Sequence, residues 1–79
     1  MNDNVDYRAP AELFPAAARR GRVAYHRFDT LSDALRFAVE ELTPALLGGA
    51  VIESEEVRYG AAEIRGLYEA AGYPLARRR

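Results

Sequence analysis

Hydrophobic residues recur with a helical period between residues 30 and 42. They lie three or four positions apart, at Leu31, Ala34, Leu35, Ala38, Val39 and Leu42. This spacing places them on one side of an α-helix as an apolar stripe. Thr30 is a suitable N-cap with Asp33 three residues later, and Pro44 comes just after the last stripe residue. The pattern predicts an amphipathic helix over residues 30–42.

A second apolar stripe with the same period predicts a helix over about residues 61–71. Its members are Ala61, Ile64, Leu67, Tyr68 and Ala71. Gly60 precedes the stripe, and Gly72 and Pro74 follow it. A glycine and then a proline are typical of a helix end, because glycine adopts the left-handed conformation and proline does not continue a helix.

Residues rich in β-branched and aromatic side chains predict the strands. Residues 22–28 read Arg-Val-Ala-Tyr-His-Arg-Phe and favour a strand. Residues 50–59 favour a hairpin with arms at 50–53 and 56–59 and a turn near Ser54 and Glu55. Between the first helix and this hairpin, residues 43–49 are expected to form a connection, since Gly48 and Gly49 loosen the backbone.

The two ends of the chain are expected to be irregular. Residues 1–21 contain Pro10 and Pro15, which interrupt regular structure, and only Leu13 and Phe14 are large apolar residues there. We therefore expect an N-terminal arm over residues 1–21, held to the body by these two side chains. Residues 22–75 are expected to form the single domain, followed by a frayed Arg-rich tail over 76–79.

The elements assemble into an α+β fold, in the order strand, helix, strand, strand, helix. A three-stranded sheet with two amphipathic helices packed on one face buries both stripes. Parallel and antiparallel pairing of the first strand both remain open at this point. The expected core comprises Val23, Tyr25 or Phe28, Leu31, Leu35, Ala38, Val39, Leu42, Val51 or Ile52, Val57, Ile64, Leu67 and Tyr68.

Composition narrows the possible functions. The chain has 79 residues, a net charge of -1 and no cysteine. Balanced charge disfavours strong non-specific attraction to nucleic acid or membrane, and a chain without cysteine forms no disulfide or thiolate metal site. All the basic residues are arginine, a composition typical of GC-rich bacterial coding sequences. The polar start and the lack of a long apolar run favour a cytoplasmic protein without a membrane segment.

Catalytic or metal-binding chemistry finds little support in the sequence. His26 is the only imidazole, and neither a cysteine nor a second histidine is present to complete a metal site. Glu53, Glu55 and Glu56 gather near the expected hairpin turn, where a solvated turn explains them. An enzyme would need His26 to meet Glu53 or Glu55 in space. We expect no enzymatic activity, no metal and no cofactor.

Phe37 does not fit the apolar stripe of the first helix, because it lies on another side between Asp33 and Glu41. One hypothesis is that it contacts a partner, and the other is that the N-terminal arm covers it through Leu13 or Phe14. The first hypothesis makes the chain a non-enzymatic protein-interaction or regulatory module, either with another protein or as a homodimer. Its candidate contacts are Phe37, Glu41 and Tyr73.

The Arg-rich first strand supports an alternative function. Arginines and aromatic rings alternate there, as in sheet faces that stack bases and follow phosphates. The candidate contacts for RNA or single-stranded DNA are Arg20, Arg22, Tyr25, Arg27 and Phe28. Glutamates elsewhere in the chain oppose a broad positive field, so this binding would be weak.

Overall fold

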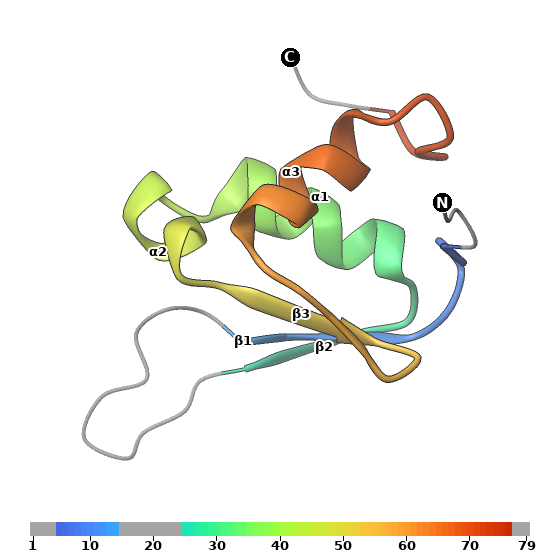
Figure 1. Ribbon diagram of the computed structural model, residues 1–79, viewed down its shortest axis with the longest axis horizontal. Coiled ribbons are helices and arrows are strands. Elements are labelled where there is room, and N and C mark those ends of the chain that lie inside the picture. The colour runs from blue at the N-terminus through green and yellow to red at the C-terminus, as the bar shows by residue number, and fades with distance from the viewer. Residues whose placement is uncertain (1–4, 15–24, 77–79) are drawn as a thin grey trace.

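The computed structural model describes residues 5–14 and 25–76, which form a four-stranded antiparallel sheet and three helices. The strands are β1 (Ala11–Phe14), β2 (His26–Phe28), β3 (Val51–Ser54) and β4 (Val57–Tyr59). The helices are α1 (Leu31–Glu41), α2 (Pro44–Gly48) and α3 (Ala61–Glu69). In space the strand order is β2-β1-β3-β4, and α1 and α3 lie together over one face of the sheet (Figure 1).

The main correction to the sequence analysis concerns the N-terminal arm. Part of the stretch expected to be irregular is β1, which lies inside the sheet between β2 and β3. Leu13 pairs with His26 on one side and Ile52 on the other, and it is 0% exposed. The sheet therefore has four strands rather than three, and β2 pairs with β1 instead of β3. Of the strand expected over 22–28, residues 22–24 lie outside the described residues.

The α+β class and both amphipathic helices are confirmed. In α1, the Thr30 side chain accepts a hydrogen bond from the Asp33 amide at 3.1 Å, as an N-cap does. In α3, the Glu63 carboxylate accepts from the Gly60 amide at 2.7 Å. That helix ends before Gly72, since Ala70 is already its C-cap.

Two connections differ from expectation. Residues 43–49 contain α2, whose first turn is capped by the Thr43 side chain accepting from the Leu46 amide at 3.3 Å. The hairpin is confirmed, but its turn lies at Glu55 and Glu56, one residue later than expected. Both have positive φ, 54° and 68°, which gives the two-residue turn that matches strand twist.

The core lies between the sheet and the helix pair. Its largest fully buried side chains are Leu13, Leu31, Leu35, Ile52, Ile64 and Tyr68. Two residues expected in the core are exposed instead, namely Tyr25 at 48% and Val57 at 46%. Val57 belongs to the outer strand β4, and Tyr25 comes directly before the outer strand β2, so neighbours cover each side chain from one flank only.

The segments before β1 and after α3 close the end of the helix pair. Tyr7 donates a hydrogen bond from its hydroxyl to the Leu67 carbonyl at 3.0 Å. Tyr73 donates to the Ser32 carbonyl at 3.1 Å, and its ring lies against both Tyr7 and Tyr68. These contacts tie the segment before β1 to α3 and the segment after α3 to α1.

Candidate interaction surfaces

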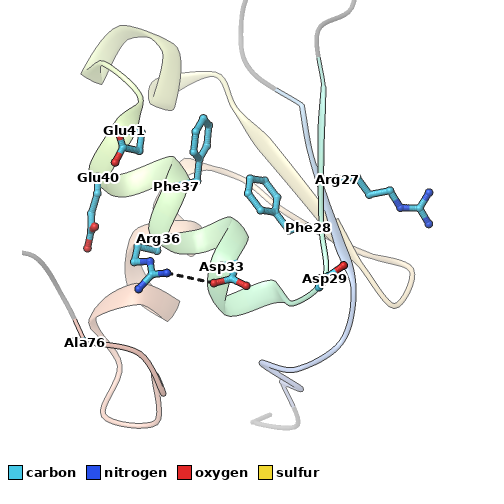
Figure 2. Close-up of a pocket in the computed structure, with 9 residues that line it drawn as sticks. All are labelled: Arg27, Phe28, Asp29, Asp33, Arg36, Phe37, Glu40, Glu41 and Ala76. Atoms are coloured by element: carbon cyan, nitrogen blue, oxygen red, sulfur yellow. Dashed lines mark hydrogen bonds and ion pairs between the residues drawn. The ribbon is translucent and has the colours of Figure 1, made fainter.

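A groove of about 740 Å³ lies between α1 and β2 and extends over the outer side of α1 toward Ala76 (Figure 2). Its aromatic members are Phe28 from β2 and Phe37 from α1, whose ring centroids are 5.5 Å apart. Its remaining lining residues are Arg27, Asp29, Asp33, Arg36, Glu40, Glu41 and Ala76. α1 packs on the core through its buried side chains, and β2 is held by its pairing with β1, so both walls belong to the folded body.

Phe37 is half-buried, and β2 is what covers it. Its ring lies 5.0 Å from the His26 ring and 5.5 Å from that of Phe28. The register of β2 against β1 explains this, because His26 and Phe28 pair with Leu13 and Ala11 and so share their helix-facing side. The hypothesis that Leu13 or Phe14 covers Phe37 gives way to a cover made by the neighbouring strand.

Acidic side chains lie at both ends of the groove. Asp29 and Asp33 lie toward one end of the groove, and Glu40 and Glu41 lie toward the other (Figure 2). Arg36 offsets one of them through an ion pair with Asp33 at 3.4 Å. The Glu40 carboxylate accepts a hydrogen bond from the Tyr68 hydroxyl, which anchors it to α3.

Arg27 contributes little to the inside of the groove. Figure 2 shows its side chain on the far side of β2 from α1. There it forms a long ion pair with Glu12, with 4.0 Å between Nη1 of Arg27 and Oε2 of Glu12. Four carboxylates and two guanidinium groups belong to the lining residues, so their formal charge is net negative even with Arg27 included.

Tyr73, the third candidate contact, is part of the hydrophobic core. It is 7% exposed, and its hydroxyl donates to the Ser32 carbonyl. Burial raises the pKa of Tyr73 to about 12; nearby Arg36 acts in the opposite direction, while Tyr68, Glu40 and Asp33 add to the rise. A side chain held in this way presents no surface to a partner.

The face of the sheet opposite the helices forms a second surface. Glu12 and Glu53 lie on the two inner strands, flanked by Arg27 and Arg58 on the outer strands. The Arg58–Glu53 ion pair measures 3.3 Å. Beside this charged row, the rings of Phe14 and Tyr25 stack at 5.4 Å.

The candidate nucleic-acid residues do not form one surface among the described residues. Tyr25 and Arg27 lie on the open face of the sheet, whereas Phe28 faces α1 in the groove. Arg20 and Arg22 lie outside the described residues. The inner positions of the open face carry glutamates, which repel phosphate.

His26 and Glu53 do not converge on a catalytic arrangement, and Glu55 lies in the turn between β3 and β4. The register places His26 on the helix-facing side of the sheet and Glu53 on the open side. Within residues 5–14 and 25–76, no group of three His, Asp or Glu side chains is arranged to hold a metal ion. No helix in this part of the chain combines the length and apolar character needed to cross a bilayer.

Comparisons with protein-family models, with curated proteins and with solved structures find no match for this chain.

Proposed function

We propose that this chain is a non-enzymatic protein-interaction module and that the groove between α1 and β2 is its contact surface. The observation that carries the proposal is the pairing of half-buried aromatic rings, Phe28 and Phe37, with carboxylates at both ends of the groove. Apolar centres with polar rims are typical of protein-binding sites. Two of the three contacts expected from the sequence, Phe37 and Glu41, line this groove.

The partner in this proposal is a different protein rather than a second copy joined edge to edge. β2 and β4 are the outer strands of the described sheet, and their central residues are Arg27 and Arg58. If either strand paired with its own copy about its centre, two arginines would lie directly opposite each other. Like charges at opposed positions destabilise such a pair. Light scattering should therefore report a monomer, and a dimer retained in high salt would contradict this choice.

The test of the proposed function compares variants of the two surfaces. The protein, immobilised by a tag, is used to capture binding partners from cells that express it, and each captured protein is then purified and titrated. Glu41→Arg changes the groove at an exposed position near the C-terminal end of α1, where a basic side chain suits the helix dipole. Tyr25→Ser changes the open sheet face and is the matched control.

The expected result is a partner whose affinity falls at least tenfold with Glu41→Arg and stays the same with Tyr25→Ser. A partner that responds only to Tyr25→Ser would move the contact surface to the open face and overturn the proposal. Phe37→Ala supplies an independent check. Because its ring is half-buried, we expect it to reduce stability by about 1–2 kcal/mol, less than a core truncation. A larger loss would make Phe37 a core residue.

A further inference from the structure

The groove adjoins an edge of the sheet. β2 is an outer strand in the order β2-β1-β3-β4, and its backbone pairs with β1 on one side. On its other side, no strand of the described residues pairs with it. An edge strand offers backbone donors and acceptors to another chain, and peptides bind other proteins by adding a strand at such an edge.

A strand added beside β2 would place every second side chain on the helix-facing side. That side leads to the groove, because His26 and Phe28 of β2 face Phe37 of α1. The alternate side chains would lie toward the open face, next to Arg27. The groove would therefore contact every second side chain of the bound segment.

The chemistry of the groove defines that pattern. The rings of Phe28 and Phe37 lie at its middle, Asp29 and Asp33 toward one end and Glu41 toward the other (Figure 2). An apolar side chain suits the middle, and basic side chains suit both ends. The distance along α1 from Asp33 to Glu41 is about 12 Å at 1.5 Å per residue. Five extended residues span about 13 Å, so the first, third and fifth would meet the acidic, aromatic and acidic regions.

We infer that the groove binds an extended basic segment of another protein, with the pattern Arg/Lys-x-Φ-x-Arg/Lys, where Φ is a large apolar residue, and that this segment extends the sheet at β2. The inference rests on the proposed function and specifies the partner. A segment of arginines alone, such as Arg77-Arg78-Arg79 of this chain, carries the charge but has no apolar residue for the middle of the groove.

A peptide selection tests the pattern without assuming one sequence. Random linear decapeptides displayed on phage are selected on the full-length protein, with counter-selection on the Glu41→Arg variant. The expected peptides carry one large apolar residue with Arg or Lys two positions before and after it. Three outcomes would overturn the inference. The selected peptides could be acidic, or they could carry apolar residues three and four positions apart, as in a helix. The selection could also yield no peptide whose binding depends on Glu41.

Backbone methylation of the best peptide tests strand addition. N-methylation removes an amide donor, and only alternate amides of an added strand point toward β2. Methylation at one set of alternate positions should weaken binding at least tenfold, and methylation at the other set should be tolerated. Equal tolerance at every position would exclude strand addition. In the protein, Asp29→Asn should weaken binding severalfold and raise its resistance to salt, whereas Tyr25→Ser should change neither.

One further variant tests whether the groove binds another protein or the C-terminal arginines of this chain. Arg77→Ser, Arg78→Ser and Arg79→Ser are combined in the full-length protein. We expect the selected peptide to bind this variant as it binds the unmodified protein. Binding that occurs only after these substitutions would assign the groove to the tail and overturn the inference. If a captured natural partner depends on Glu41 but binds through a helical or acidic segment, the inference fails while the proposed function stands.

Discussion

The place of β1 inside the sheet leads to a strong prediction for Leu13→Ala. Leu13 is 0% exposed and pairs with His26 and Ile52 on either side. Truncating a buried leucine removes its transfer free energy and leaves a cavity, at a cost of about 2–5 kcal/mol. A chain of 79 residues has a total stability of about 4–12 kcal/mol. Leu13→Ala should therefore remove a large part of the stability of the whole protein.

Urea unfolding monitored by far-UV circular dichroism measures this effect. With a slope near 1 kcal/mol per molar urea for a small domain, the midpoint should fall by about 2 M or more. Val57→Ala is the matched control, because Val57 is also an apolar strand residue but is 46% exposed. It should cost less than about 1 kcal/mol. A loss below about 0.5 kcal/mol for Leu13→Ala would show that residues 11–14 are not part of the folded body, and would refute the reasoning.

Four other predictions, three on variants and one on the unmodified protein, have defined outcomes. Replacing Glu55 by Asn and Glu56 by Gly should raise the free energy of unfolding by about 1–2 kcal/mol in urea titration, because both backbones have positive φ that these residues adopt more readily; an unchanged midpoint would contradict that turn. Thr30→Ala should cost about 1 kcal/mol in the same assay, since the capping bond to Asp33 is lost, whereas Thr30→Ser should restore most of it. The pKa of Tyr73 is raised from 10.0 to about 12, so its contribution to stability is fully present below pH 10 and is lost between pH 10 and 12. The free energy of unfolding of Tyr73→Phe should therefore depend less on pH in that interval. The same pH profile for both proteins would argue against the shift. The purified protein should not be retained on RNA or single-stranded DNA at about 50 mM salt, where phosphate attraction is strong, and retention there would restore the nucleic-acid alternative.

Elements defined by local patterns were predicted well. The stripe from Leu31 to Leu42 identified α1, and Thr30 identified its start, because a cap and an apolar period are properties of consecutive residues. The hairpin followed from two short runs of strand-forming residues on either side of a polar turn. Its turn was misplaced by one residue, since Glu55 and Glu56 are not the Asn or Gly that usually mark positive φ.

β1 was missed because its neighbours in sequence gave the opposite signal. Pro10 and Pro15 on either side indicated an interruption, and four residues are too few for a convincing alternation. Yet Ala11 and Leu13 are buried while Glu12 is not, which is the period of a strand covered on one face. α2 was missed for a similar reason, although Thr43 and Pro44 form a cap followed by proline at the first helical position.

The candidate site was predicted only in part. Phe37 stood out because it lies off the apolar stripe, and Glu41 lies one helical turn further along the same flank. What lies beside Phe37 depended on the position of β2, which pairs with a strand that the sequence analysis did not contain. The burial of Tyr73 was not predicted, since it results from contacts with Tyr7 and Ser32, more than forty residues away in sequence.

The sequence by itself determined the α+β class, the two amphipathic helices and the hairpin, because hydrophobic period, capping residues and strand propensity act over a few consecutive positions. Only the tertiary structure decided that β1 lies at the centre of the sheet, that β2 is its edge, and that Phe37 meets Phe28 beside a row of carboxylates. Those features depend on which segments pair across long sequence separations. Pairing is selected by the joint burial of side chains such as Leu13 and Ile52, and neither segment alone indicates which partner it pairs with.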